Sequence, residues 1–391
     1  LVLTTRSDKT RLGGPAELFE NIPAGDVSIA FDQAKAVEIY GPMLNMMAPM
    51  MMGAQPGKPA DKQQQQQVQQ AMAQAKTFMD MFASWDFGMT FKGSEMDVNA
   101  RWVLTNPADK SYGASDFDAY TEVMTAADAT MGMIMSRGLL DCLISADAQM
   151  SMGMDNDKLK SLFALATHAV QGMTGSTGAS YGISDKGMWG MQILDVKDAE
   201  TYLTEVTEMV KALDDADMGI SVEDLPLVDA SGRGYLMKVD MVKLMDSMGM
   251  KAMVDADDLE RSQGIVDAIL GGKAGVPIRY LHEGNKFAIV FGHKGSVIGR
   301  AKQILAGRDV GTPNTLTNLV SSAQGSPMMV AAVDVRKMVG QLMKLLSQVP
   351  AVVEDMGGKI PTVPAGDPIM VTGTATTMLK GGQLIATIDV G

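Results

Sequence analysis

The sequence predicts an α+β protein, with antiparallel sheets covered on one face by helices and built from repeated β-α-β-β units. Three observations lead to this fold class: apolar residues alternate over short runs, glycine-containing turns separate those runs, and helical spacing follows them. The chain of 391 residues is 46% hydrophobic and 20% charged, which is typical of a folded protein large enough for two or three domains.

Two stretches at opposite ends of the chain share one pattern. They are "IPAGDVSIAFDQAKAVEIYGPML" (22–44) and "SPMMVAAVDVRKMVGQLMKLL" (326–346). In each, a proline precedes a short alternating strand, an aspartate ends the strand, and helical spacing follows. We interpret Asp32 and Asp334 as helix N-caps rather than catalytic groups, because a carboxylate at this position accepts a hydrogen bond from an early backbone N–H.

Each stretch leads to an expected hairpin. The first spans 87–104 and turns near 92–94, and the second spans 369–390 and turns at 380–382, where glycine supplies a positive φ. Both ends of the chain therefore follow the order β-α-β-β. The first copy carries an insert with a methionine cluster and a glutamine run (63–67). Apolar residues at helical spacing follow the glutamines, so we expect a solvated helix with a narrow apolar stripe.

The middle of the chain repeats the order hairpin, helix, hairpin, helix. Hairpins are expected at 178–195 and 279–292, and a helix follows each one, at 196–213 and 296–307. Gly307, where the second helix stops, is typical of a glycine C-terminal cap. We divide the chain into an N-terminal tail and three α+β units, of which the first holds the insert: 1–20, 21–172, 173–310 and 311–391.

Composition excludes several classes of function. The formal charge is 33 − 46 = −13, so we expect no nucleic acid partner. Cys142 is the only cysteine, which excludes disulfides within the chain and metal sites with several thiolates. No run of about 20 apolar residues occurs, so no transmembrane segment is expected. We interpret the opening "LVLTT" as the remnant of N-terminal processing and expect an extracytoplasmic location, in the periplasm, at the cell surface or secreted.

Three segments occur in a fixed order: "GMWGMQILDVKDAETYL" (187–203), "NKFAIVFGHKGSVIGRAKQIL" (285–305) and "SPMMVAAVDVRKMVGQL" (326–342). Their strand–helix junctions resemble those of a family of uncharacterised bacterial extracytoplasmic, lipoprotein-like proteins with repeated strand–helix–hairpin units. The resemblance covers roughly 178–346, with a weaker echo at 22–44. It implies export, often behind an anchored N-terminus, although no lipobox cysteine occurs here, and it brings no active-site residues.

The sequence contains no complete catalytic motif. No segment has the Gly-x-Ser-x-Gly spacing of a nucleophile elbow, and "GGKAG" (271–275) lacks the other residues of a phosphate-binding P-loop. We interpret His168, on a predicted apolar helix, as a structural histidine rather than a base. His282 and His293 bracket one hairpin, and with Glu283 they are candidates for a metal site of two histidines and one carboxylate.

Methionine is abundant, with 36 residues along the chain. Met43, Met46, Met47 and Met50 have the i, i+3, i+4, i+7 spacing of one helix face, and their thioethers are candidate ligands for Cu(I). The same spacing is that of any buried helix face, and methionine is an adaptable core filler. The sequence leaves core, contact surface and copper site open.

A contact surface is the third interpretation of this cluster. Pro49 ends or kinks the helix, so the methionines around it cannot all face one core. Exposed apolar patches mark interfaces, and flexible thioethers suit contacts that adapt to a partner. The candidate interaction residues are Met46, Met47, Met50, Met51 and Met52.

These observations predict a non-enzymatic exported protein without a cofactor, which acts through contacts with a protein partner or with itself. A carrier of an apolar ligand or lipid, held in a methionine-lined cavity, is the alternative. Extracytoplasmic Cu(I) binding is a second alternative, and a hydrolase built on His282 and His293 is the last.

Overall fold

The structure is a computed structural model, and it describes most of the chain from residue 113 onward together with isolated strands before it. The described residues are 2–5, 27–32, 82–92, 95–104, 113–125, 129–141, 157–226, 232–247, 256–308, 313–323, 326–380 and 383–390.

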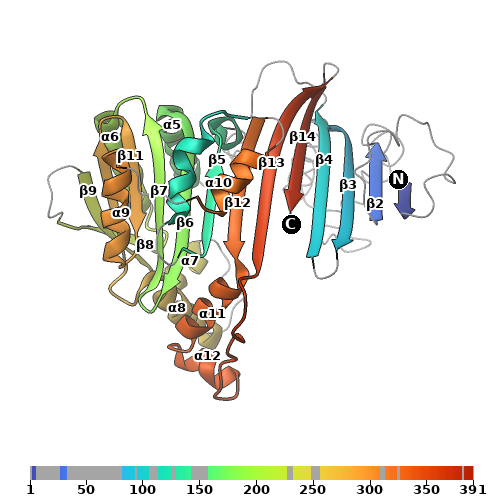
Figure 1. Ribbon diagram of the computed structural model, residues 1–391. Coiled ribbons are helices and arrows are strands. Elements are labelled where there is room, and N and C mark those ends of the chain that lie inside the picture. Colours follow the sequence, from blue (N-terminus) through green and yellow to red (C-terminus); the bar gives the residue numbers. More distant parts are fainter. Residues whose placement is uncertain are drawn as a thin grey trace, which may run out of the picture.

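The strands of the described residues form a single antiparallel sheet (Figure 1). Its order is β1-β2-β3-β4-β14-β13-β12-β5-β6-β7-β11-β10-β9-β8. The strands are β1 Val2–Thr5, β2 Val27–Asp32, β3 Phe82–Lys92, β4 Glu95–Leu104, β5 Met131–Met135, β6 Met173–Ser184, β7 Gly187–Val196, β8 Ile220–Asp224, β9 Gly232–Val239, β10 Val276–Glu283, β11 Lys286–Phe291, β12 Ser326–Asp334, β13 Met370–Lys380 and β14 Gln383–Val390.

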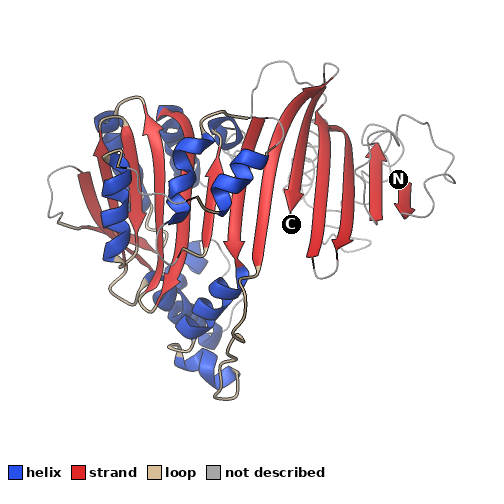
Figure 2. Cartoon of the chain, viewed as in Figure 1, coloured by secondary structure: helices blue, strands red, loops and turns tan. Residues whose placement is uncertain are grey.

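Helices pack on the part of the sheet between β13 and β8 (Figure 2). They are the 3-10 helix η1 Phe117–Thr125 and the α-helices α5 Asp157–Gly172, α6 Ala199–Asp215, α7 Met241–Ser247, α8 Ala256–Leu270, α9 Gly295–Leu305, α10 Thr315–Ser322, α11 Val335–Leu346 and α12 Pro350–Asp355. The predicted α+β class is confirmed.

All four expected hairpins are present. β3 and β4 are antiparallel neighbours, and so are β6 and β7, β10 and β11, and β13 and β14. The turn between β6 and β7 joins Ser184 to Gly187, whose φ of +99° requires glycine. Local alternation and turn chemistry therefore define these hairpins, as the sequence indicates.

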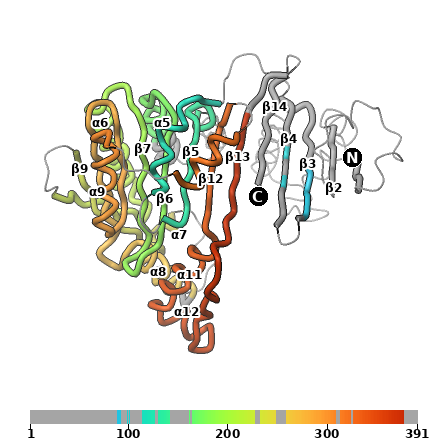
Figure 3. Tube along the Cα trace, in the orientation of Figure 1, coloured from blue at the N-terminus to red at the C-terminus, as the bar shows by residue number. Residues whose placement is uncertain are grey.

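The sheet brings together strands that lie far apart in the sequence. β12, which precedes the last hairpin, pairs with β13 on one side and with β5 on the other. β14 pairs with β4 of the first hairpin. Figure 3 follows this path along the chain, with the late strands β12 and β13 between β14 and β5. The predicted division into three units stays a prediction.

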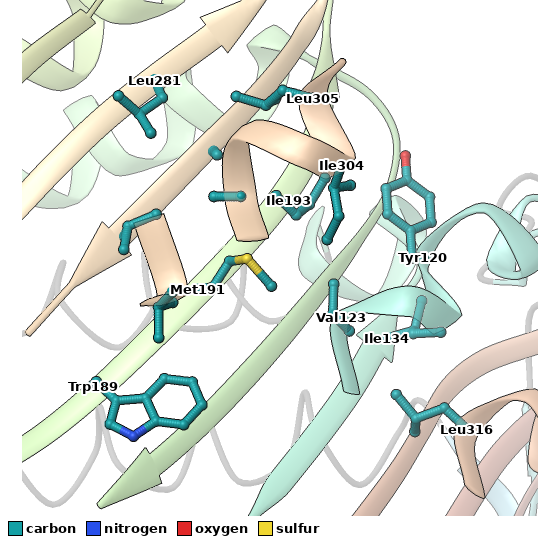
Figure 4. Packing of buried hydrophobic residues seen from close by; sticks show 14 of the residues in the cluster. Tyr120, Val123, Ile134, Trp189, Met191, Ile193, Leu281, Ile304, Leu305 and Leu316 are labelled. Carbon is teal, nitrogen blue, oxygen red and sulfur yellow. The ribbon is translucent and has the colours of Figure 1, made fainter. Parts of the chain in front are cut away.

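Helices cover both faces of the sheet, where the sequence led us to expect one covered face. On β7, Trp189, Met191 and Ile193 pack with η1, α9 and α10; we call this side the α9 face (Figure 4). The next residue along, Leu194, packs with α5 and α6 on the opposite side, which we call the α6 face. Successive strand residues point to opposite faces, so the nearly continuous apolar run of β7 buries both sides.

A side chain occupies one backbone donor on the outer side of the edge strand β8. Its residues pair with β9, and the N–H of Val222 donates outward to Asp214 Oδ1 at 2.9 Å. Asp214 belongs to the last turn of α6. Charged or covered edges of this kind prevent strands of other molecules from pairing with the sheet.

The two aspartates expected to cap helices have different outcomes. Asp334 is the N-cap of α11, and its Oδ1 accepts a hydrogen bond from the Lys337 N–H at 2.9 Å. This prediction is confirmed. Asp32 is the last residue of β2, and the segment that follows it lies outside the described residues.

Candidate functional site

Three glycine-containing loops, each with one lysine, meet at one end of the sheet. The first is the β6–β7 turn 185–187, the second is 271–275 between α8 and β10, and the third is 292–295 between β11 and α9. We call them the lysine loops, after Lys186, Lys273 and Lys294. In Figure 1 they lie at the end of the sheet where α8, α11 and α12 gather.

Glycine allows the lysine loops to touch backbone to backbone. A Cβ on Gly271 would lie 2.3 Å from His293 Cδ2 and 2.7 Å from the Lys186 carbonyl oxygen. A Cβ on Gly187 would lie 2.7 Å from the Gly271 nitrogen. His293 Nε2 is 3.0 Å from the Gly275 carbonyl oxygen, which ties the third loop to the second. The three loops are therefore held in fixed relative positions.

The loops border a cleft of about 460 Å³. Its charged and polar lining comes from Asp185, Lys186, Asp267, Lys273, His293 and Gln348, and Ala268, Val349 and Pro350 supply an apolar part. A second hollow of about 350 Å³ lies beside it and shares Asp267, Gly272 and Lys273. This end of the sheet combines an open cleft with charged side chains and a small apolar part, and concave surfaces with convergent polar groups are candidate ligand sites.

A separate polar cluster joins η1 to β6 and β7. The Tyr120 hydroxyl donates to Asp195 Oδ2 at 2.7 Å. Asp116 accepts from the Ser176 N–H at 2.9 Å and also from the Ser176 hydroxyl. Ser176 lies where the β6–β7 register shifts between Met173 and Thr177, so Asp116 satisfies a backbone donor that the ladder leaves unpaired.

The chemistry of this cluster is structural. Burial raises the pKa of the Tyr120 phenol far above its ordinary value, and the hydrogen bond to Asp195 raises this pKa further. The phenol therefore keeps its proton and acts as a donor. Its charge-assisted bond fixes η1 on the sheet.

The histidines do not form the metal site that the sequence left open. His282 pairs with Phe287 near the hairpin turn, and its Nε2 lies 3.5 Å from Glu200 Oε1. His293 follows the far end of β11, so about six strand residues, roughly 20 Å, separate it from His282. Among the described residues, no group of three or more His, Cys, Asp or Glu side chains is arranged to hold a metal ion.

His168 has a structural partner, as the sequence analysis expects. Its Nδ1 lies 3.1 Å from Glu205 Oε1, which joins α5 to α6. Cys142 and the candidate copper and interaction residues lie outside the described residues: Met43, Met46, Met47, Met50, Met51 and Met52.

Methionines of β5 and β12 do form a surface on the α6 face. Met135 is paired with Met329, and Met133 with Ala331, and all four residues are partly exposed. Directly opposed residues of an antiparallel pair share a face. Met135 also pairs with Thr177, which pairs with Leu194 of the α6-face core. The sequence pattern Met131-x-Met133-x-Met135 carried this signal.

The sequence analysis does not identify the lysine loops as a site. Gly271–Gly275 was considered only as a P-loop, which it is not, because it follows a helix rather than a strand. The usable signal is the recurrence of lysine beside glycine in three turns, at 185–187, 271–275 and 292–295. Their meeting depends on tertiary structure.

Comparisons with known proteins give structural likeness only. No family model matches the chain, and no curated protein matches it. Among solved structures, the chain is similar to crystal form IV of TP0453, with 6% identity, a TM-score of 0.30, and coverage of 70% of this chain and 95% of that one. Crystal form III of TP0453 gives 7% identity, a TM-score of 0.30, and coverage of 68% and 93%. In the parts of the chain that the structure describes, no helix has the length and apolar character needed to cross a bilayer.

Proposed function

We propose that the protein acts by contact rather than by catalysis, and that the contact surface is the α6 face of the sheet between β5 and β1. The observation that carries this proposal is the register of the sheet. One row of directly paired residues crosses eight strands on this face: Met135, Met329, Ala375, Ile388, Ala100, Phe87, Ile29 and Leu3.

A second apolar row runs beside the first, and each of its members lies two residues away from a member of the first row on the same strand. Its members are Met133, Ala331, Gly373, Val390, Val98, Met89, Val27 and Thr5. Nearly every position in the two rows is apolar, so this face has the composition of a surface that excludes water.

Described side chains of this region support the same surface as a place of contact. Met89 and Val98 in this region are partly exposed, and Phe91 is 53% exposed. Burial of such a surface against a protein partner or a second copy contributes about 25 cal/mol per Å² of apolar area, from which the entropy lost on association is subtracted.

Light scattering coupled to size exclusion tests this function. We expect mass to rise with protein concentration, or with a co-purified partner, and to fall in a Met133→Ser, Met329→Ser double variant. Val242→Ser is the matched control, because Val242 is an apolar residue of α7 that is 40% exposed and lies outside the two rows. A strict monomer with no partner at any concentration contradicts the proposal.

A carrier of an apolar ligand is the second candidate. It is favoured by the four partly exposed positions of β5 and β12, where thioethers adapt to a flexible chain. Native mass spectrometry of gently extracted protein would detect a bound lipid. Export is part of the same proposal, and fractionation of cells that express the tagged protein tests it.

A further inference from the structure

We propose that the cleft between the lysine loops binds a ligand that carries a phosphate group. This site is independent of the proposed contact function, because it lies at the β6–β7 turn and the end of α8, away from the apolar rows of β5–β1. The proposal stands on three observations: a cleft of about 460 Å³, two lysines that form no ion pair with a described residue, and one imidazole whose Nε2 carries the hydrogen.

The two lysines of the cleft are uncommitted cations. Lys186 and Lys273 both line the cleft and are exposed, and among the described residues neither ammonium group has a carboxylate partner. Other lysines of this region are engaged. Lys238 Nζ lies 2.5 Å from Glu223 Oε1, and Lys294 Nζ lies 4.7 Å from the centre of the Trp189 ring.

His293 supplies a further polar group in a defined form. A carbonyl oxygen only accepts hydrogen bonds, so the 3.0 Å contact with Gly275 assigns the hydrogen to Nε2. Nδ1 is therefore the ring atom that remains for a ligand, as an acceptor in the neutral ring and a donor in the charged ring. The ring itself is held against Gly271, which has no Cβ to displace it.

Two carboxylates also line the cleft, and they sharpen the test. Asp267 Oδ1 accepts a hydrogen bond from Gln263 Nε2 at 2.7 Å, so one oxygen of this carboxylate already has a partner. Asp185 lies at the exposed rim, and its backbone carbonyl, not its side chain, accepts from Gln348. The Asp185 carboxylate therefore opposes an anion without holding the loop in place.

Phosphate fits this arrangement better than a singly charged anion. It carries up to two negative charges and at least three acceptor oxygens, so it can meet two ammonium groups at once, and lysine is a point-charge donor to phosphate. In a chain of net charge −13, a cleft whose two lysines balance its two carboxylates repels anions less than the rest of the surface does.

The first experiment titrates inorganic phosphate into the full chain and follows backbone amide resonances by NMR. We expect saturable shifts at Gly271, Gly272 and Lys273. The Lys186→Ala, Lys273→Ala double variant should weaken binding about tenfold, since two exposed ion contacts to the phosphate are lost. Asp185→Asn should change affinity in the opposite direction and tighten it two- to fivefold.

Lys211→Ala is the matched control, because Lys211 is an exposed lysine of α6 and lines neither hollow. It should bind phosphate as the wild-type chain does. The proposal is overturned if phosphate causes no saturable shifts, or if all three variants respond like the wild-type protein. Unchanged circular dichroism in each variant shows that the fold is intact.

A second titration separates the two sources of a phosphate group. Short-chain phosphatidic acid below its micelle concentration is compared with inorganic phosphate and with short-chain phosphatidylcholine. Tighter binding of phosphatidic acid than of inorganic phosphate identifies a lipid headgroup, with the apolar part of the cleft at Val349 and Pro350 contacting the chain. Equal binding of the first two identifies a free phosphate compound. Preference for phosphatidylcholine overturns the proposal.

Discussion

The hydroxyl of Tyr120 in η1 donates a hydrogen bond to Asp195 Oδ2 of β7 at 2.7 Å, a contact between residues 75 positions apart in the sequence. Tyr120 is 3% exposed, and its ring belongs to the core of the α9 face (Figure 4). The bond therefore joins a helix that crosses the sheet to the end of a central strand. Beside it, Asp116 holds the irregular part of β6.

Removal of this bond should destabilise the chain. Tyr120→Phe leaves the ring in the core and deletes the donor, and we expect a loss of about 1–3 kcal/mol in the free energy of unfolding, since a bond to a charged acceptor is lost. Urea denaturation measures this change. Asp195→Asn keeps an acceptor and should cost less than Tyr120→Phe. Equal stability of the wild-type and Tyr120→Phe proteins would show that the bond contributes nothing.

The buried tyrosines should ionise late in an alkaline titration. Burial raises the pKa of Tyr280 to about 12, and burial also raises the pKa of Tyr181 and Tyr202 above the ordinary value of 10.0. Because the folded-state pKa exceeds the unfolded one, these groups stabilise the fold fully below pH about 10, and this stability is lost as the pH rises toward 12.

Tyrosinate absorbance in the intact protein follows this titration. We expect fewer tyrosines to ionise at pH 10 than after unfolding in urea, and Tyr280→Phe should remove one of the late steps. Tyrosines that all titrate with the ordinary pKa would show that these rings are accessible to water.

The N-cap of α11 contributes measurably to the stability of the fold. Asp334→Ala removes the acceptor for the Lys337 N–H, and we expect a loss of about 1 kcal/mol in the free energy of unfolding. Asp334→Asn should retain most of the stability, because asparagine is an equally good cap. A similar loss in both variants would assign the effect to charge and not to the cap.

Gly271 controls the geometry of the lysine loops. Its φ is +93°, and an alanine Cβ would meet the His293 ring and the Lys186 carbonyl oxygen. Gly271→Ala should therefore destabilise the chain and shift the amide resonances of all three loops. Gly272→Ala is the control for the backbone term alone, because its φ is +99° and no atom lies within 4 Å of the added carbon. Equal effects of the two variants would show that the loop contacts do not matter.

The hairpins and the cap at Asp334 could be predicted because their causes are local. Alternation of apolar residues, a glycine in the turn and a carboxylate before a helix act within a few residues. The pairing of β12 with β5 could not be predicted in this way, because it joins strands about 200 residues apart whose sequences both fit many partners.

The candidate sites also depend on contacts between distant parts of the chain, which the sequence alone does not predict. His282 and His293 bracket one hairpin in the sequence, but a hairpin separates residues that lie near its turn from residues at its open end, so the two rings stay apart. Lys186, Lys273 and Lys294 lie in three separate turns, and only the packing of α8 and α9 on the sheet brings those turns together. The strand β7 also explains the helices on both faces, because its nearly continuous apolar run must be covered on both sides.

The hydrogen bond from the edge strand β8 to the carboxylate of Asp214 in α6 has a consequence for aggregation. A strand from another molecule that added to β8 would need the Val222 N–H as a donor, and that donor is already occupied. Release of this donor requires the final turn of α6 to open locally, so a more stable helix end leaves this side of the sheet less able to recruit new material.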